Sequence, residues 1–482
     1  MRRVAVIGGG ITGLAAAHAL DRAVAQGGLE GAVLLEAGPR LGGRVLTERA
    51  DGFLIEGGPD SFITLKPQAV QFAHELGLRD RLVGTLEPRR VFIRRGGRLL
   101  PLPDGLTGLI PQRLEPFLRS PLFSLGEKAR FGLEPFIRPA INGADESLGG
   151  FVRRRLGDAA VDRLAAPLLA GIHAGDVDRL SLRATFPQLA DAERRYGSLT
   201  RAVLARRRAG RRRAGEAPEG DATGGPLPAF MTVRGGLEEL IVRAASSLRH
   251  VTVRTRTAVE GLRRRRGGYV LDLAGGEQLE ADAVILAVPA EAAAELLMEV
   301  NGPAAAVAGS IRSVSTAVIA LGFRRDHVRH SLSGHGYVGS HREPSAHTAC
   351  TWVSSKWPDR APEGMALLRC FVGRDGAQDA LAMDDGDLAA AVIAELRPLL
   401  GITGMPVLTR VYRWRDAMPQ YEVGHLDRLA AMEAALAATP GLVTAGAPYR
   451  GVGLPDCIAQ GMRAARHAVN ALRVVQPGPR QP

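Results

Sequence analysis

The chain has 482 residues, 46% of them hydrophobic, which is enough for two or three compact units with sizeable cores. Its formal net charge of +12 would ordinarily indicate nucleic acid or an anionic membrane as a partner. Much of the excess lies in two arginine-rich stretches, residues 201–213 and 263–266, while lysine occurs only at Lys66, Lys128 and Lys356. A compositional bias explains this use of arginine, and no nucleic-acid-binding motif accompanies it. We therefore expect no nucleic-acid partner, and attraction to a membrane surface stays open.

Neither an exported protein nor a metalloprotein is indicated. No stretch approaches the ~20 uncharged apolar residues of a membrane-spanning helix. The first apolar run leads into glycines instead of the cleavage site of a signal peptide. Three cysteines, Cys350, Cys370 and Cys457, lie far apart without a C-x-x-C pair, which provides neither a metal site nor a disulfide framework. These features predict a cytoplasmic protein without a bound metal.

The first stretch of the chain follows the order strand, glycine turn, helix, strand and acid. Residues 3–7 form a short apolar run, typical of a strand buried on both faces of a parallel sheet. A motif of G-x-G-x-x-G spacing follows, with Gly8, Gly10 and Gly13 as its glycines. Residues 14–20 then predict a helix, and the next apolar run ends on Glu36. This order predicts a dinucleotide-binding unit.

The residue types of this unit suit a dinucleotide. Gly8 allows a tight turn, Gly10 lets the backbone approach a pyrophosphate, and Gly13 lets helix and strand pack closely. The free N–H groups and the positive dipole end of the helix favour phosphates. Glu36 lies 23 residues after Gly13, close to the ~20 expected, and can accept hydrogen bonds from ribose hydroxyls. The same acid disfavours NADP, whose ribose phosphate it would repel.

The residues after Glu36 indicate which dinucleotide binds. The chain continues as Ala37-Gly-Pro-Arg-Leu-Gly-Gly-Arg44 and then as Gly52-Phe-Leu-Ile-Glu-Gly-Gly-Pro-Asp-Ser61. This order resembles the flavoprotein amine-oxidase superfamily, in which a G-G-R turn follows the ribose acid and binds FAD. The turn glycines would let the chain pass close to the cofactor, and Arg44 would bring a fixed cation to its phosphates or flavin. Because no second G-x-G-x-x-G unit is present to hold NAD(P)H, an oxidase that uses O2, or a quinone, is expected.

Apolar runs and turn residues predict the remaining elements. A helix is expected over residues 69–77, and a hairpin over residues 90–102 turns at Gly96-Gly97. Residues 103–180 have a helical texture, and the arginine-rich stretch 206–226 is interpreted as a mobile surface loop. Strands are expected over residues 250–254, 257–262, 269–273, 281–289, 313–323, 366–373 and 442–446, before a last helix that runs from about Gly453 to Leu472.

The C-terminal part carries the most specific resemblance. Residues 446–461 read Gly-Ala-Pro-Tyr-Arg-Gly-Val-Gly-Leu-Pro-Asp-Cys-Ile-Ala-Gln-Gly. Together with the segment Trp414–Tyr421 and the turn Gly58–Ser61, this motif resembles the oxygen-dependent protoporphyrinogen/coproporphyrinogen oxidases of haem biosynthesis. The segment Gly171–Gly175 fits the same family. The resemblance covers essentially the whole chain, with the stretch 206–226 as its main departure.

The resemblance implies a fold of class α/β and α+β. A discontinuous Rossmann-like FAD-binding domain would be joined by a mixed-sheet substrate domain and by a helical domain able to contact a membrane. The FAD-binding domain is expected to comprise residues 1–85, 230–290 and 440–475. The substrate domain would comprise residues 86–102, 181–229 and 291–439, and the helical domain residues 103–180.

By residue match, the resemblance assigns FAD to residues from distant parts of the chain. They are Gly8, Gly9, Gly10, Ile11, Thr12, Gly13, Glu36, Ala37, Gly43, Arg44, Gly58, Pro59, Asp60, Ser61, Val259, Trp414, Gly451, Val452, Gly453 and Leu454. The residues themselves agree at the last of these sites. A helix starting after Gly453 would aim its N-terminal amides at the flavin and stabilise the anionic reduced form.

The activity that the resemblance implies is a six-electron oxidation of a porphyrinogen. A methylene carbon would give a hydride to flavin N5, a proton would leave elsewhere, and O2 would regenerate the flavin with release of hydrogen peroxide. Coproporphyrinogen III and protoporphyrinogen IX are both candidate substrates, with the former slightly favoured. Arg90 resembles the propionate-binding arginine of some family members. Two roles stay open for Asp60, proton removal or the capping of a turn, and His173 is interpreted as a packing residue.

Other interpretations stay open. The chain could be an amine oxidase or a carotenoid desaturase of the same superfamily; amine oxidases often place a lysine beside flavin N5, and only Lys356 qualifies here. Cys457 is interpreted as a buried helix residue and not as a covalent flavin link. A non-enzymatic flavin- or haem-handling protein is disfavoured, because lipid binding alone needs none of the flavin-facing motifs. Peripheral contact with the cytoplasmic face of a membrane and a homodimer are further expectations.

Overall fold

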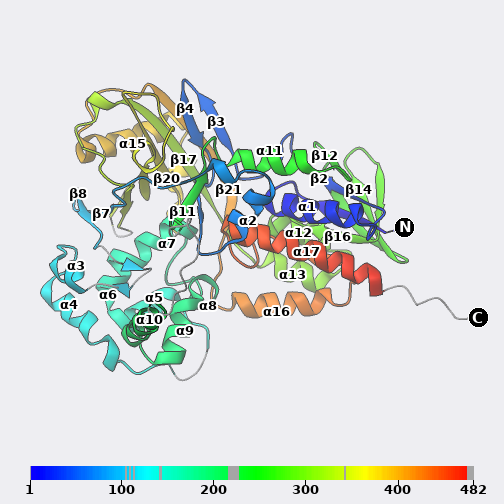
Figure 1. Ribbon diagram of the computed structural model, residues 1–482, viewed down its shortest axis with the longest axis horizontal. Coiled ribbons are helices and arrows are strands. Elements are labelled where there is room, and N and C mark those ends of the chain that lie inside the picture. The colour runs from blue at the N-terminus through cyan, green and yellow to red at the C-terminus, as the bar shows by residue number, and fades with distance from the viewer. Residues whose placement is uncertain are drawn as a thin grey trace, which may run out of the picture.

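The computed structural model describes residues 2–103, 106–107, 110–111, 114–140, 144–214, 227–340 and 343–474. Figure 1 shows a helix-covered sheet with α1 and α17 on the right, a second sheet at the upper left and a group of helices at the lower left. The mixture of a parallel sheet, a mixed sheet and a helical body confirms the predicted fold class.

A five-stranded parallel sheet forms the centre of the first body, which we call the nucleotide unit. Its strands follow the order β12 (Val251–Arg254), β2 (Gly31–Leu35), β1 (Arg3–Ile7), β16 (Ala283–Leu286) and β22 (Leu442–Thr444). Successive residues of β1 face opposite sides of the sheet. Val4 and Val6 pack in one core, and Ala5 and Ile7 pack in another. This burial on both faces is what the unbroken apolar run of β1 predicts.

Helices cover both faces of this sheet. On one face lie α1 (Ile11–Ala25), α2 (Gln68–Glu75), α11 (Glu238–Ser247) and α17 (Leu454–Val474). On the other face lie α12 (Ala290–Leu297), α13 (Gly302–Gly309), α16 (His425–Leu436) and the small sheet of β13 (Val259–Arg265), β14 (Gly268–Leu273) and β15 (Gln278–Ala281). Residues 291–439 were predicted to belong to the substrate domain. Helices α13 and α16 instead pack on this sheet, because their apolar side chains share a core with β1 and β16.

The second body is a seven-stranded sheet, which we call the substrate-side sheet. Its order is β21 (Leu408–Pro419), β17 (Ser313–Arg324), β20 (Met365–Val372), β19 (Ala349–Trp352), β18 (Gly336–Gly339), β7 (Val91–Arg95) and β8 (Arg98–Pro101). β7 and β8 form the hairpin predicted across Gly96-Gly97, and the sheet is mixed because β7 and β18 run parallel.

The substrate-side sheet is packed on both faces. Helix α15 (Asp385–Leu400) packs on one face of the sheet. The other face contacts β4 (Phe53–Glu56), which pairs with β3 (Thr47–Ala50). Leu367 and Trp357 contribute to the core that holds β4 against this sheet. β11 (Phe230–Val233) lies between β5 (Phe62–Ile63) and β6 (Leu82–Gly84) in a further small sheet. The segment that follows β4 therefore lies between the nucleotide unit and the substrate-side sheet.

The third body, which we call the helical unit, is built around one apolar core. Its helices are α3 (Leu114–Arg119), α4 (Leu125–Gly132), α5 (Leu148–Leu156), α6 (Asp158–Ala160), α7 (Ala166–His173), α8 (Leu182–Thr185), α9 (Pro187–Tyr196) and α10 (Leu199–Ala214). Leu182, Leu189 and Leu199 pack in one core with Phe151. The helical unit therefore continues beyond residue 180, the predicted end of the helical domain. None of the described helices is both long and apolar enough to cross a membrane.

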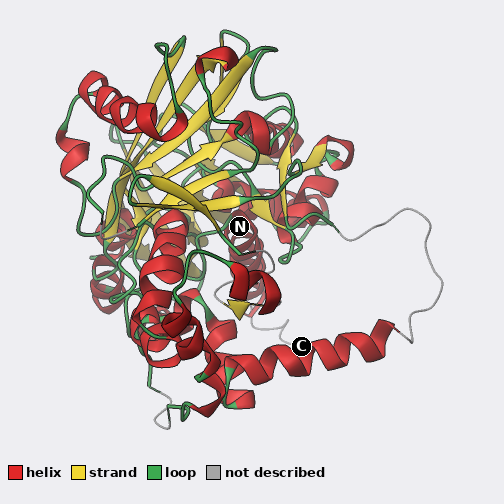
Figure 2. Cartoon of the chain, turned by 90° about the vertical axis from the view of Figure 1, so that its left-hand side faces the viewer, coloured by secondary structure: helices red, strands yellow, loops and turns green. Residues whose placement is uncertain are grey.

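The arginine-rich stretch is partly helical. Figure 2 shows α10 extending from the helical unit as a straight arm. Residues 206–226 were predicted from the sequence to form a loop, but the helix continues to Ala214. Arginine and alanine are strong helix formers, which explains the difference. The rest of that stretch, residues 215–226, lies outside the described residues.

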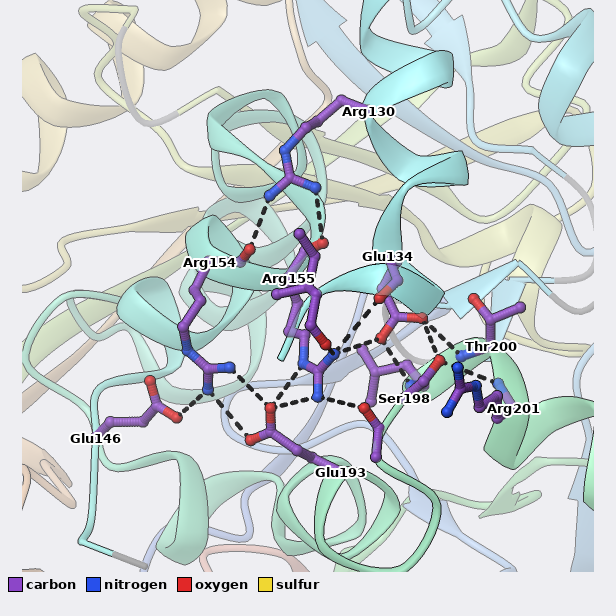
Figure 3. Close-up of polar contacts among 12 residues, drawn as sticks. Arg130, Glu134, Glu146, Arg154, Arg155, Glu193, Ser198, Thr200 and Arg201 are labelled. Atoms are coloured by element: carbon purple, nitrogen blue, oxygen red, sulfur yellow. Dashed lines mark hydrogen bonds and ion pairs between the residues drawn. The ribbon is translucent and has the colours of Figure 1, made fainter. Parts of the chain in front are cut away.

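A buried ion-pair network joins four elements of the helical unit (Figure 3). Arg155 and Glu134 are both fully buried, and Arg155 Nε donates to Glu193 Oε1 at 2.7 Å. Arg155 Nη2 also donates to the carbonyl oxygen of Gly197 at 2.7 Å. Glu134 accepts the N–H of Leu199 at 2.8 Å, at the start of α10. Buried charges are tolerated only when partners surround them in this way.

Candidate cofactor and active site

The glycine turn after β1 contains glycines required for two different reasons. Gly8 has a φ of +105°, and a Cβ there would lie 2.5 Å from the carbonyl oxygen of Ala287. A Cβ on Gly13 would lie 1.9 Å from the carbonyl oxygen of Gly8, so the chain itself excludes a side chain at both positions. A Cβ on Gly10 would meet no described atom within 4 Å. Gly10 therefore leaves a bare backbone surface at the start of α1, as an approaching pyrophosphate requires.

Glu36 is fixed at the end of β2 with both carboxylate oxygens in use. Oε2 accepts the N–H of Gly9 at 2.6 Å, and Oε1 accepts the N–H of Gly38 at 2.7 Å. The backbone carbonyl of Glu36 accepts the N–H of Thr257, two residues before the Val259 that begins β13. Each carboxylate oxygen has further acceptor capacity for a ribose hydroxyl. The predicted adenosine-end residues thus meet at one edge of the sheet.

The G-G-R turn lies directly against the glycine motif. Gly42 N donates to the carbonyl oxygen of Gly9 at 2.8 Å, and a Cβ on Gly43 would lie 3.2 Å from Gly10 Cα. Arg40 stabilises the turn, because its Nη2 donates to the carbonyl oxygen of Gly43 at 2.5 Å. The sequence did not single out Arg40, because its partners are backbone carbonyls and its residue type is common throughout this chain.

Arg44 is a cation for which the described residues provide no counter-ion. It has no hydrogen bond or ion pair with any of the residues described, and it is only partly exposed. Burial lowers the pKa of Arg44, which means that its charge is costly in the protein alone. A phosphate group at this position would supply the missing charge and accept paired hydrogen bonds from the guanidinium. The donor set and the bare surface at Gly10 therefore fit a dinucleotide.

The turn that contains Gly58–Ser61 packs on Arg44. A Cβ on Gly58 would lie 1.7 Å from the carbonyl oxygen of Arg44, so only glycine allows this approach. The preceding carbonyl, of Gly57, accepts Trp414 Nε1 at 2.7 Å. Trp414 belongs to β21 of the substrate-side sheet. The structure thus brings Trp414 to the same loop as Arg44, as the resemblance implies.

Asp60 lies within a cluster of donors. Lys356 Nζ donates to Asp60 Oδ2 at 2.8 Å, and Trp357 Nε1 donates to the same atom at 3.1 Å. Oδ1 accepts the hydroxyl of Ser61 at 2.7 Å. Arg369 Nη1 lies 3.8 Å from Oδ2, and its Nη2 donates to the carbonyl oxygen of Gly58. The sequence considered Lys356 only as an amine-oxidase lysine and did not identify Arg369.

The surroundings of Asp60 favour one of the two roles considered for it. Burial alone would raise the pKa of Asp60, but the charges of Lys356 and Arg369 outweigh it and hold that pKa well below its usual range. A carboxylate that is permanently charged and already bonded is a poor proton acceptor. The geometry therefore favours an anchoring role for Asp60 over proton removal.

The loop before α17 is held from the end of β21. Gly451 N donates to the hydroxyl oxygen of Tyr421 at 2.9 Å, and that hydroxyl donates to the carbonyl oxygen of Ala447. Gly451 has a φ of +106°, and a Cβ there would lie 2.5 Å from Asp456 Cγ. α17 then begins at Leu454, so its free N–H groups lie beside this loop. Such a helix start is suited to stabilising negative charge on a bound group.

Cys457, in the first turns of α17, is buried. Burial raises the pKa of its thiol to about 11, so the thiol is protonated at physiological pH. A protonated, enclosed thiol is a poor nucleophile. This environment supports the interpretation of Cys457 as a buried helix residue.

Arg90 precedes the first strand of the β7–β8 hairpin and is exposed. Its carbonyl oxygen accepts the N–H of His335 at 2.7 Å, and its guanidinium has no partner among the described residues. The neighbouring Leu86 donates its N–H to the carbonyl oxygen of Lys356 at 3.0 Å. Arg90 is thereby placed on a segment bonded to the element that carries Lys356.

Within the part of the chain that is described, no group of three or more His, Cys, Asp or Glu residues could hold a metal ion. The contacts above join the glycine motif, the ribose acid, the G-G-R turn and the loop before α17 along the edge of one parallel sheet. Together they define an oxidoreductase of the class that binds a flavin dinucleotide.

Comparison with known proteins gives the same class. Residues 11–469 match the family of flavin containing amine oxidoreductases, and the chain belongs to this family. It is 40% identical over 475 residues to the coproporphyrinogen III oxidase of Bacillus subtilis (strain 168), covering 98% of each chain. It is 30% identical to protoporphyrinogen oxidase 1 of Arabidopsis thaliana, covering 94% of this chain and 85% of that one. A crystal structure from Exiguobacterium sp. 255-15 superposes with a TM-score of 0.83 at 35% identity, covering 97% and 99% of the two chains. The cofactor is therefore FAD.

Proposed function

We propose that this protein is an FAD-dependent oxidase that removes six electrons from a porphyrinogen, with O2 as the final acceptor, in haem biosynthesis. The proposal is supported by family membership and by the name coproporphyrinogen III oxidase carried by several relatives that match over nearly the whole chain. Bound FAD supplies the hydride acceptor and returns its electrons to O2 as hydrogen peroxide. The protein supplies binding, orientation and electrostatics.

The balance of charge beside the turn Gly57–Ser61 carries the proposal. One carboxylate, Asp60, faces two cations, Lys356 and Arg369. Arg44, on which the turn packs, is assigned to the FAD phosphates and is not counted in this balance. The resulting excess of positive charge attracts the propionates of a porphyrinogen and repels the ammonium group of an amine substrate. The same balance argues against an amine oxidase.

FAD would lie along the edge that carries the predicted residues. Glu36 and Val259 would hold the adenosine, and the N–H groups at the start of α1 would hold the pyrophosphate together with Arg44. The loop before α17 would lie against the flavin, with Trp414 and the turn Gly58–Ser61 on the other side. These assignments rest on the contacts within the chain described above.

We place coproporphyrinogen III ahead of protoporphyrinogen IX as the substrate. At two positions coproporphyrinogen III carries propionates, whereas protoporphyrinogen IX carries vinyl groups. Arg90 offers an exposed, unpaired guanidinium on the segment bonded to the element of Lys356, and guanidinium pairs well with a carboxylate. A further propionate of coproporphyrinogen III would pair with the guanidinium of Arg90.

The test incubates the purified yellow protein aerobically with each porphyrinogen and follows porphyrin fluorescence and peroxide. Faster formation of coproporphyrin is the expected result, and Arg90→Ala should raise KM for coproporphyrinogen III more than for protoporphyrinogen IX. Arg95→Ala, an exposed arginine of the same hairpin, is the matched control and should change neither KM. Bound FAD without oxidation of either porphyrinogen would overturn the assignment and make amines the next substrates to try.

We also propose that the helical unit contacts a membrane surface. Leu125 and Phe136 are 83% and 79% exposed, and Leu118 and Leu133 on the neighbouring elements are more than half exposed. The exposed Arg119 and Arg138 lie next to them in the chain, and apolar side chains flanked by cations suit an anionic bilayer surface. Co-sedimentation with vesicles containing phosphatidylglycerol should be weakened by the double variant Leu125→Ser, Phe136→Ser. Met298→Ser, which changes an exposed side chain of the nucleotide unit, should have no effect, and binding that the double variant leaves intact would contradict the proposal.

A further inference from the structure

The end of helix α7 has an uncommon backbone conformation. Ala174 has a φ of +49°, in the left-handed region that residues with a side chain rarely adopt. The turn is held from two sides. Gln420 Nε2 donates to the carbonyl oxygen of His173 at 3.0 Å, and Asp375 N donates to that of Ala174 at 2.7 Å. Such conformations persist where their surroundings hold them, and they concentrate at functional sites.

The turn fixes the backbone of His173 but leaves its side chain without a polar partner. The residue is only 6% exposed, Nδ1 is enclosed without a hydrogen bond, and no ring nitrogen bonds to a residue that the structure describes. An unpaired buried polar atom costs about 1–3 kcal/mol, so its presence requires an explanation. Gly171 and Ile172, directly before His173, are exposed. The buried ring therefore follows directly on an exposed part of α7.

His173 also lies near Tyr421, the residue that holds the loop before α17. Its ring centroid is 6.1 Å from that of Tyr421, the residue whose hydroxyl accepts the N–H of Gly451. Lys66, which is paired at 2.7 Å with Asp456 in the first turn of α17, acts electrostatically on the ring. A substrate between the helical unit and the flavin would thus lie against His173.

The imidazole is neutral and can accept a proton only from a strongly acidic donor. Burial, reinforced by the charge of Lys66, lowers the pKa of His173 to about 4. The ring is therefore neutral at physiological pH and has a free acceptor nitrogen. Asp60, the other candidate, has its oxygens bonded to Lys356, Trp357 and Ser61.

We infer that His173 accepts the pyrrole proton of the porphyrinogen, an assignment that rests on the function proposed above. In each two-electron round a methylene C–H bond breaks, and its electron pair leaves with the hydrogen as a hydride to FAD. The macrocycle then carries a positive charge conjugated to a pyrrole nitrogen, so the N–H of that ring becomes acidic. A ring nitrogen of His173 takes this proton while the N–H electron pair stays on the macrocycle. The imidazolium then returns the proton to solvent, which matches the proton consumed when peroxide forms.

The test measures the reductive half-reaction alone. Holoenzyme and coproporphyrinogen III are mixed without oxygen, and bleaching of the flavin absorbance is followed by stopped flow. His173→Gln keeps a polar side chain of similar length but accepts no proton, and we expect flavin reduction to be about 100-fold slower. FAD content, reoxidation by O2 and binding of coproporphyrin, measured by fluorescence quenching, should be unchanged. His330→Gln, at a half-buried histidine of the substrate-side sheet, is the control and should keep the wild-type rate.

A second variant separates base catalysis from a structural role. His173→Ala should be as slow as His173→Gln, and added imidazole should restore part of its rate. Reduction at the wild-type rate in either variant, or slow variants that imidazole does not accelerate, would overturn the assignment. If the wild-type protein itself is not reduced by the porphyrinogen, the proposed function fails, and the inference fails with it for a distinguishable reason.

Discussion

Lys356 Nζ lies 2.8 Å from Asp60 Oδ2, and this ion pair joins α14 (Val353–Lys356), the short helix between β19 and β20 of the substrate-side sheet, to the turn Gly57–Ser61. The two side chains are only 16% and 13% exposed. Arg369, from the neighbouring strand β20, adds a second cation to the same carboxylate. The turn Gly57–Ser61 is thus held by side chains of the other sheet. Its final geometry requires that the two bodies have docked.

Asp60→Asn should be strongly destabilising. The change leaves the mostly buried Lys356 without its counter-ion and removes the nearer of the two carboxylates that act on Arg369, and we expect the free energy of unfolding of the holoenzyme to fall by about 3 kcal/mol. Urea unfolding at neutral pH, followed by flavin fluorescence, measures it. Glu277→Gln breaks the surface pair with Arg254 and should leave the urea midpoint almost unchanged. An Asp60→Asn protein as stable as the wild type would show that the cations need no counter-ion.

Two glycines of the same motif should behave differently when changed to alanine. Gly13→Ala places a Cβ 1.9 Å from a backbone oxygen, which no rotamer change can relieve, so we expect a loss of about 3 kcal/mol or more in the free energy of unfolding. Gly10→Ala meets no described atom within 4 Å, so the stability without FAD should change by less than about 1 kcal/mol. Its FAD affinity should nevertheless fall. Thermal unfolding and FAD titration of both variants provide the comparison, and unchanged FAD binding in Gly10→Ala would place the pyrophosphate elsewhere.

The nucleotide unit could be predicted closely because its signals are local. The spacing of Gly8, Gly10 and Gly13, the acid Glu36 and the apolar run of β1 all lie within one short segment, and hydrogen-bond geometry links them directly. The β7–β8 hairpin was predictable for the same reason, since its turn residues lie between its strands. Each of these elements is specified by neighbours in sequence.

The cluster around Asp60 could not be predicted, because its members are distant in sequence. Lys356 is 296 residues from Asp60, and Arg369 is further still. The 62 basic residues include only three lysines, so an arginine with a special role, such as Arg369 or Arg40, has no distinguishing sequence signal. For a similar reason α13 and α16 were predicted in the substrate domain although they pack on the nucleotide unit, since an apolar helix face does not reveal which sheet it covers.

The stability of the substrate-side sheet should depend on pH through Glu395. Burial alone would raise the pKa of Glu395, but hydrogen bonds from His347, Ser345 and the N–H of Ala346 outweigh it and lower that pKa to about 2. A carboxyl whose pKa is lowered on folding contributes stability above its unfolded pKa and loses it as pH falls through the folded value. Glu395→Gln should therefore be about 3 kcal/mol less stable than the wild type at neutral pH.

The pH dependence of that difference is the decisive measurement. Between pH 4.5, the ordinary value for a glutamate, and about pH 2, the stabilities of the wild type and Glu395→Gln should converge. Urea unfolding at a series of pH values, followed by tryptophan fluorescence, measures both proteins. A difference that stays constant over this range would mean that Glu395 acts through packing and not through its charge.

The network around Arg155 predicts that the charge, and not the bulk, of this side chain holds the helical unit together. Arg155→Ala leaves the fully buried Glu134 without its cation and removes one of the two arginines paired with Glu193, which keeps Arg154, and we expect the free energy of unfolding to fall by about 3 kcal/mol. Arg155→Met keeps most of the volume and should lose nearly as much, because Glu134 is still left buried without a cation. Arg194→Ala, which removes the exposed partner of Asp191, should have little effect. Urea unfolding of the three variants separates the cases. If methionine restored wild-type stability, packing would be the reason that Arg155 is buried, and the ion pairs would contribute little.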